Sequence, residues 1–202
     1  MADRIQIGSL IERLFDPNPH TRNESLRAIH REGVSLFTDT LKNWSAEPEF
    51  ANLLRRVHSG SERLNSPSEA IVVGIAVMPE IFDRIRSANG NAPLSSVPPQ
   101  QDALEFELFL DVGVNIDVLT SREPEGSGAI ARYLKKFGGG IQQVELYVRN
   151  VDRATEILRS RFSVVPIYNT TQIGAEGTRV NFFLVPASDE KKLLVELVQA
   201  QH

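Results

Sequence analysis

A strand–helix–strand pattern that occurs twice constrains this chain more than any other feature. The clearer copy covers residues 140–199. Its first strand, Ile141–Val148, alternates apolar and polar side chains with a period of two, and Asn150 then offers a capping side chain for a helix. Three further strands are expected in short runs rich in β-forming residues, at Val164–Tyr168, Thr178–Val185 and Leu193–Val198. The segment therefore predicts a βαβββ unit.

Residues 70–121 contain a weaker copy of this pattern. A strand at Ile71–Val77, a helix from Pro79 and two strands at Leu104–Asp111 and Val114–Ser121 are indicated by the same periodicities. The missing strand is expected near Pro93–Val97. With a joining helix at 128–137, the predicted fold class is α+β. Two paired βαβββ modules, 70–121 and 140–199, form one domain over 68–199 with a cupped mixed sheet.

The first 60 residues are expected to be all helical. A first amphipathic helix ends near Leu14, a second runs from a capping box at Thr21 to a terminating Gly33, and others contain Trp44 and begin at Pro48. We interpret residues 1–60 as a helical lobe that acts as a cap or an interaction surface. The polar segment 59–68 is the expected domain boundary.

Composition excludes several kinds of site. The chain of 202 residues has no cysteine, which excludes disulfides, thiolate nucleophiles and cysteine-ligated metals. None of its four histidines lies on a predicted strand, so a site rich in imidazole is not expected. A net charge of −4 gives no reason to expect nucleic acid or an anionic membrane as a partner. The chain shows no long apolar run and no signal-peptide pattern, so a cytoplasmic protein is expected.

Pairing of the two modules would collect polar side chains on the concave face of the sheet. The residues expected to line this cup are Val72, Glu105, Glu107, Asn115, Asp117, Gln143, Glu145, Tyr147, Asn181 and Glu196. Carboxylates gathered in this way stay open to water, bind a cation or raise their own pKa values. Ordinary structural roles are open as well. Glu196 could form an ion pair with Arg179, and Gln143 could hydrogen-bond across the cup. Glu105 and Glu107 could lie on the solvent-exposed side of a strand.

Three runs of sequence resemble a known superfamily. They are residues 127–144, 174–186 and 193–199, and they are similar to the second half of methylmalonyl-CoA epimerases and to the vicinal oxygen chelate superfamily, which includes glyoxalase I, bleomycin-resistance proteins and extradiol dioxygenases. The resemblance implies a metal held by one residue on each of four strands, and a carboxylate that removes the proton α to a thioester carbonyl. Carried over by position, the ligands are Val72, Asp117, Gln143 and Glu196, and the base is Glu107. The family usually has histidine at the positions of Val72 and Gln143.

Three functional hypotheses follow. The first is a glyoxalase-like protein with a degenerate metal site that binds a small molecule or a partner in the cup. The second is a divergent epimerase or lyase acting on an acyl-CoA or a 2-oxo compound, with Glu107 as base and Mg²⁺, Ca²⁺ or Mn²⁺ on Asp117, Gln143 and Glu196. The third is a scaffold protein that works through the helical lobe. A homodimer is expected from the resemblance.

Overall fold

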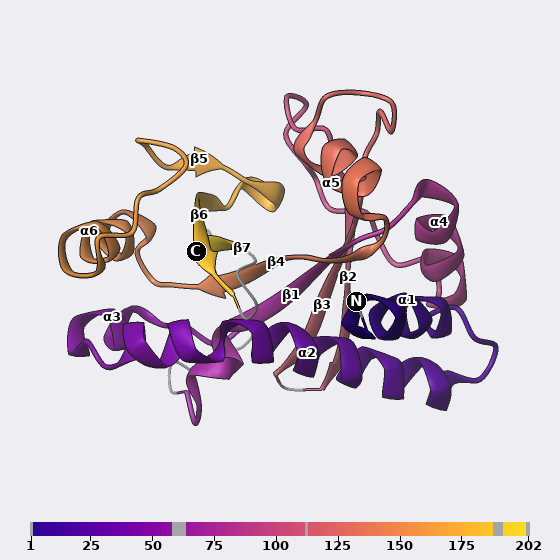
Figure 1. Ribbon diagram of the computed structural model, residues 1–202, viewed down its shortest axis with the longest axis horizontal. Helices are drawn as coiled ribbons and strands as arrows, with labels where there is room; N and C mark the ends of the chain where they lie inside the picture. Colours follow the sequence, from indigo (N-terminus) through magenta and orange to yellow (C-terminus); the bar gives the residue numbers. More distant parts are fainter. Residues whose placement is uncertain (1, 58–63, 112, 188–191, 201–202) are drawn as a thin grey trace.

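A seven-stranded mixed sheet that curls into a half-barrel forms the centre of the computed structural model (Figure 1). The structure describes residues 2–57, 64–111, 113–187 and 192–200. The strand order is β2-β3-β1-β4-β7-β6-β5. The strands are β1 (Ile71–Ala76), β2 (Leu104–Asp111), β3 (Val114–Thr120), β4 (Gly140–Tyr147), β5 (Gln172–Ile173), β6 (Arg179–Pro186) and β7 (Lys192–Gln199).

Two similar halves meet where β1 and β4 pair antiparallel. In the first half β1 pairs in parallel with β3, and in the second half β4 pairs in parallel with β7. The outer neighbours, β2 and β6, are antiparallel to β3 and β7. This arrangement confirms the predicted fold class of paired modules around a cupped mixed sheet.

Two strands differ from the prediction. Pro93–Val97 forms no strand, and one backbone hydrogen bond, from Ser95 N to Glu105 O (2.9 Å), ties this segment to β2. In the second half, the strand expected at Val164–Tyr168 is not formed, and this segment makes an isolated bridge between Pro166 and Phe183. The additional strand of this half is instead the short β5. Proline at that position has no N–H to donate, which prevents a regular ladder.

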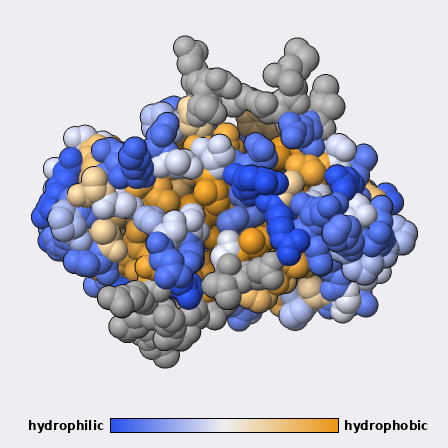
Figure 2. Space-filling model, turned by 90° about the horizontal axis from the view of Figure 1, so that it is seen from below, coloured by the Kyte–Doolittle hydropathy of each residue, from blue (hydrophilic) through white to orange (hydrophobic). Residues whose placement is uncertain are grey.

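Helices enclose the main core of the sheet on its convex face, with the exception of α5 (Ala129–Phe137), which packs on the concave side. They are α1 (Ala2–Arg13), α2 (Pro19–Ser45), α3 (Pro48–Leu53), α4 (Pro79–Ala88), α5 (Ala129–Phe137) and α6 (Val151–Phe162), with 3-10 turns η1 (Pro67–Ala70) and η2 (Ala175–Gly177). The convex-face side chains of β1, β4 and β7 share one apolar cluster with α2, α4 and α6. Figure 2 views the side on which α2 and α3 lie, and apolar residues show between polar ones there. No helix in the described ranges is both long and apolar enough to cross a membrane.

Helix α2 is one long helix rather than two. The predicted end at Gly33 is wrong, because α2 continues to Ser45 without a break. A side chain at residue 33 would place its Cβ 2.4 Å from Cγ1 of Val73, so glycine lets α2 lie directly on β1. The helix starts after Asn18, whose side chain accepts a hydrogen bond from His20 N (3.0 Å), rather than at Thr21.

Two elements close the concave face at its ends. Helix α5 packs Ile130 and Leu134 over Ala76 and Leu119, which point to the concave side. At the other end, the chain after α3 runs beside the end of β4, where Arg55 N donates to Tyr147 O (3.0 Å). The expected domain boundary at 59–68 falls partly on residues 58–63, outside the described residues, and stays a prediction.

Candidate functional site

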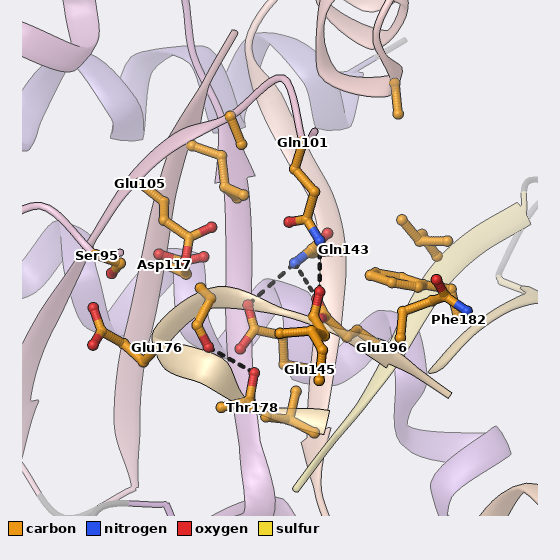
Figure 3. Close-up of a pocket in the computed structure, with 18 of the residues that line it drawn as sticks. Ser95, Gln101, Glu105, Asp117, Gln143, Glu145, Glu176, Thr178, Phe182 and Glu196 are labelled. Atoms are coloured by element: carbon orange, nitrogen blue, oxygen red, sulfur yellow. Dashed lines mark hydrogen bonds between the residues drawn. The ribbon is translucent and has the colours of Figure 1, made fainter. Parts of the chain in front are cut away.

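A cavity of about 1110 Å³ occupies the concave face of the sheet. Both halves of the sheet, α5, the segment after α3 and the loops before β2 and β6 contribute to its lining. Seven of the residues that were expected to face the cup line it: Glu105, Glu107, Asp117, Gln143, Glu145, Tyr147 and Glu196. The fold therefore brings most of the predicted site together (Figure 3).

Gly74 makes the floor of this cavity possible. It lies at the centre of β1, opposite Asp117 on β3 and Gln143 on β4. A Cβ at this position would lie 2.5 Å from Cγ of Gln143. The absence of a side chain therefore lets Gln143 lie across the middle of the floor.

The amide group of Gln143 connects two carboxyl groups. Its Nε2 donates to Oε2 of Glu196 (2.9 Å) and to Oε1 of Glu145 (3.1 Å), as Figure 3 shows. These two hydrogen bonds join Gln143 to its own strand, β4, and to the neighbouring strand, β7. Arg179 pairs with Asp152 (2.6 Å) and not with Glu196, because β6 directs Arg179 toward α6.

Burial and mutual repulsion raise the pKa values of the carboxyl groups in the cavity. Burial, with the charges of Glu107 and Glu176, raises the pKa of Glu105 to about 7. Burial, with the charges of Glu105 and Glu107, raises the pKa of Glu145 to about 8. Burial and neighbouring carboxylates also raise the pKa values of Asp117 and Glu196 well above their usual range. At neutral pH the cluster therefore holds both carboxylic acids, which donate hydrogen bonds, and carboxylates, which accept protons.

Three expected cup residues lie elsewhere. Val72 and Asn115 are on the concave face but fully buried, and neither lines the cavity. The assignment of Asn181 to the cup is wrong, because the register pairs Asn181 with Leu197 on the convex side and Phe182 with Glu196 on the concave side. Phe182 therefore takes the lining position, and Asn181 lines a separate polar groove beside α6.

Some lining residues had no signal in the sequence. A bulge between Gly74 and Ile75 disturbs the pairing with β4, and both Gln142 and Gln143 line the cavity. The backbone of Glu176 adopts a left-handed conformation (φ 51°) inside η2, which neither periodicity nor composition indicates.

Glu176 also joins the two loops that flank the cavity. Its Oε1 accepts from Ser96 N (2.6 Å), and its own N–H donates to Ser96 O (2.9 Å). Nearby, Gln101 Nε2 donates to Ile173 O (2.9 Å). These contacts connect the loop before β2 to the loop before β6 across the cavity.

The side chains at the implied metal positions do not fit a metal ion as they stand. Val72 has no donor atom, and Gln143 presents its nitrogen to the carboxyl groups instead of its oxygen. Across the described parts of the chain, no group of three or more His, Asp or Glu is arranged to hold a metal. A cation on Asp117, Gln143 and Glu196 stays a prediction.

Comparison with known proteins supports the fold assignment. No protein-family model matches the sequence, and no curated protein sequence matches it. Among solved structures, methylmalonyl-CoA epimerase from Mycobacterium tuberculosis is similar with a TM-score of 0.55 and 28% identity, covering 69% of this chain and 93% of that chain. A hypothetical protein from Bacillus halodurans has a TM-score of 0.53 and 22% identity, covering 65% and 93%. Another methylmalonyl-CoA epimerase has a TM-score of 0.52 and 22% identity, covering 65% and 94%.

These structures share the curled mixed sheet described above. The resemblance seen in the sequence is thus confirmed: the chain has the glyoxalase-like fold of the vicinal oxygen chelate superfamily, with methylmalonyl-CoA epimerase among its structural relatives.

Proposed function

We propose that the protein binds a small organic molecule in the cup, as a glyoxalase-like protein whose metal site has degenerated. The observation that carries this proposal is the cavity of about 1110 Å³, which is close to the upper end of the roughly 300–1000 Å³ usual for small-molecule sites. Its walls include the apolar side chains of Leu119, Ile130 and Phe182, and its polar groups converge on one floor. Apolar walls with a few convergent polar groups are typical of ligand sites.

Native mass spectrometry of gently purified protein tests this proposal. We expect a bound mass of a small molecule on the wild-type chain. The Gly74→Ala variant should lose most of it, because the added Cβ must displace Gln143 from the floor. A circular-dichroism melt of the variant checks that it is folded. A wild-type chain that carries no small molecule and shows no shift in melting temperature with a broad metabolite library would contradict the proposal.

Similarity to methylmalonyl-CoA epimerase at 28% identity favours a second candidate, a divergent epimerase or lyase. In this candidate the carboxylate of Glu107 takes the proton α to a carbonyl of an acyl-CoA or 2-oxo compound. The electron pair moves to the carbonyl oxygen, which accepts a hydrogen bond from a protonated neighbour such as Glu145.

Replacement of Glu107 tests this candidate. Glu107→Gln should abolish exchange of the α-proton with deuterated water and leave ligand affinity nearly unchanged. Glu125→Gln is a matched control, because Glu125 is exposed at the surface and pairs with Lys135. An unchanged exchange rate in Glu107→Gln removes this residue from the mechanism.

A further inference from the structure

Two donor side chains lie next to each other at one end of the cavity. Arg55, in the segment after α3, lies opposite Tyr147 at the end of β4, and its backbone N donates to Tyr147 O (3.0 Å). The adjacent pair along the chain is the isolated bridge between Leu54 and Val148, whose side chains belong to the main apolar cluster. Residues opposite each other on antiparallel strands point to the same face, with Cβ atoms about 5 Å apart. The side chains of Arg55 and Tyr147 therefore lie side by side on the concave face, where both line the cavity.

The guanidinium group of Arg55 is not engaged by the protein. Among the residues that the structure describes, none forms a hydrogen bond or an ion pair with this side chain. The other two arginines that line the cavity have partners. Arg56 pairs with Glu69 (2.5 Å), and Arg132 donates to the backbone oxygen of Ser127. A guanidinium group keeps its charge at any physiological pH, so Arg55 brings a positive charge to the cavity wall without a counter-ion beside it.

The hydroxyl group of Tyr147 is a second donor that the protein does not use. No described residue forms a hydrogen bond with it, and it is not one of the polar atoms that are shut off from solvent. Burial and the nearby carboxyl groups raise the pKa of Tyr147 well above its usual value, so the hydroxyl keeps its proton and can donate it. A tyrosine hydroxyl inside a protein usually has a hydrogen-bond partner. This hydroxyl therefore points to a ligand as its partner, independently of Arg55.

The surroundings of the two donors favour an anion. Tyr147 pairs with Val198 on β7, an apolar side chain that is 4% exposed and also lines the cavity. Where apolar side chains exclude water, a guanidinium group attracts an anion more strongly. The next side chain on the same face of β4 is Glu145, about 7 Å further along the strand. Because its pKa is raised to about 8, Glu145 is mostly protonated at neutral pH and does not repel an anion at Arg55.

The two donors fit a carboxylate better than a phosphate. A guanidinium group presents two parallel N–H groups to the two oxygens of a carboxylate, and the hydroxyl of Tyr147 can donate to one of these oxygens as well. Arg55 supplies one positive charge, which balances one negative charge. A phosphate monoester carries nearly two negative charges at neutral pH and would bring the second one toward the carboxyl groups of the cavity floor.

We propose that Arg55 and Tyr147 together hold the carboxylate of an organic acid, whose carbon skeleton then extends along β4 into the cavity. This proposal rests on the proposed function, since it names the chemical class of the ligand in the cup. Neither residue belongs to the three runs of sequence that resemble the superfamily, at 127–144, 174–186 and 193–199. Arg55 follows α3, so the amino-terminal region of the chain contributes directly to ligand binding.

Isothermal titration calorimetry with matched pairs of probes tests the proposal. The probes are short- and medium-chain monocarboxylates, hexanoate and phenylacetate among them, and their primary amides, which have the same shape without the charge. We expect the wild-type chain to bind the carboxylates tighter than the amides by about tenfold or more. Arg55→Gln should remove this difference, and Tyr147→Phe should reduce it about threefold, since one neutral donor is lost.

Arg31→Gln is the matched control. Arg31 is exposed on α2 and does not line the cavity, so this variant should prefer the carboxylates as the wild type does. A circular-dichroism melt checks that each variant is folded. The comparison of acid and amide separates a role in binding from a role in stability, because a loss of structure would weaken both probes of a pair.

Several outcomes would overturn the proposal. Amides that bind the wild type as tightly as the acids, or acids that bind Arg55→Gln unchanged, would do so and leave the proposed function standing. Inorganic phosphate that binds through Arg55, without binding of any carboxylate, would overturn the carboxylate class.

If no probe binds, a molecule retained by the wild type in native mass spectrometry decides the question. A retained acid that Arg55→Gln loses would support the proposal, whereas a retained acid that Arg55→Gln keeps, or a retained molecule without a carboxylate, would overturn it. If no probe binds, nothing is retained and the metabolite library gives no shift in melting temperature, the proposal and the proposed function fail together.

Discussion

Gln143 shows how one residue sets the character of the site. Its amide nitrogen connects Glu145 and Glu196, and it lies in the space left by Gly74. In the superfamily that the sequence resembles, histidine usually occupies this position as a metal ligand. The neutral amide here donates to both carboxyl groups, and at neutral pH Glu145, whose pKa is raised to about 8, keeps its proton.

The carboxyl groups predict an unusual pH dependence of stability. Folded Glu105 and Glu145, with pKa values raised to about 7 and about 8, hold protons that the unfolded chain has lost above its ordinary glutamate pKa near 4.5. The folded state therefore binds more protons than the unfolded state, and the free energy of unfolding falls as pH rises through this range. His30 has a lowered pKa, and its opposite effect ends above its ordinary value of 6.5.

Between pH 6.5 and 8 we therefore expect the ligand-free protein to lose about 1–3 kcal/mol of stability. Urea unfolding followed by circular dichroism across this range measures the loss. Glu145→Gln should reduce the slope, because one of the groups that keep a proton in the folded state is gone. Equal slopes in the wild type and the variant would show that Glu145 keeps an ordinary pKa.

At the scale of elements, the close packing of α2 on β1 depends on a single glycine. The Cβ of an alanine at residue 33 would lie 2.4 Å from Cγ1 of Val73, which is a fully buried side chain. The helix and the strand must separate or Val73 must move, and neither is easy in a packed core.

Gly33→Ala should lower the free energy of unfolding by about 1–3 kcal/mol, although alanine favours a helix more than glycine does. Gly8→Ala in α1 is the matched control, since nothing lies within 4 Å of a Cβ there, and it should leave stability equal or slightly higher. Chemical denaturation of both variants measures the difference. A Gly33→Ala variant as stable as the control would mean that α2 has room to shift.

Much of the fold could be predicted from the sequence because alternation reports which side of a strand is covered. This alternation located β1, β2, β3, β4 and β7 along the chain. It also placed the acidic side chains of Asp117, Glu145 and Glu196 on the same face of the sheet. It failed for β6, where polar and apolar residues do not alternate cleanly and Phe182 and Phe183 stand side by side. There the register came out one residue off, which exchanged Asn181 for Phe182.

Local signals also failed where distant contacts decide the structure. Gly33 has the pattern of a helix end, but its role is to fit against Val73, forty residues further along the chain. The left-handed backbone of Glu176 is held by its hydrogen bonds to Ser96, which lies in the loop before β2, far away in the sequence. Sequence periodicity contains no information about such partners.

For the whole molecule, the amino-terminal helices and the sheet share one apolar core. Trp44 packs edge to face against both Phe37 and Phe50, and these residues belong to the same cluster as Val73 and Val195. The helical region thus contributes to the stability of the sheet. An independent interaction lobe, as well as the expected homodimer, stays a prediction.

The apolar side chains that stabilise the fold and the polar groups that would contact a ligand lie on opposite faces of one sheet. The carboxyl groups of the hollow are absent from the main apolar cluster, which lies behind them. A lineage with this layout can exchange the charge of its interior lining, by a few substitutions, and keep its architecture. The residues that would decide which ligand binds are thus separate from those that hold the fold.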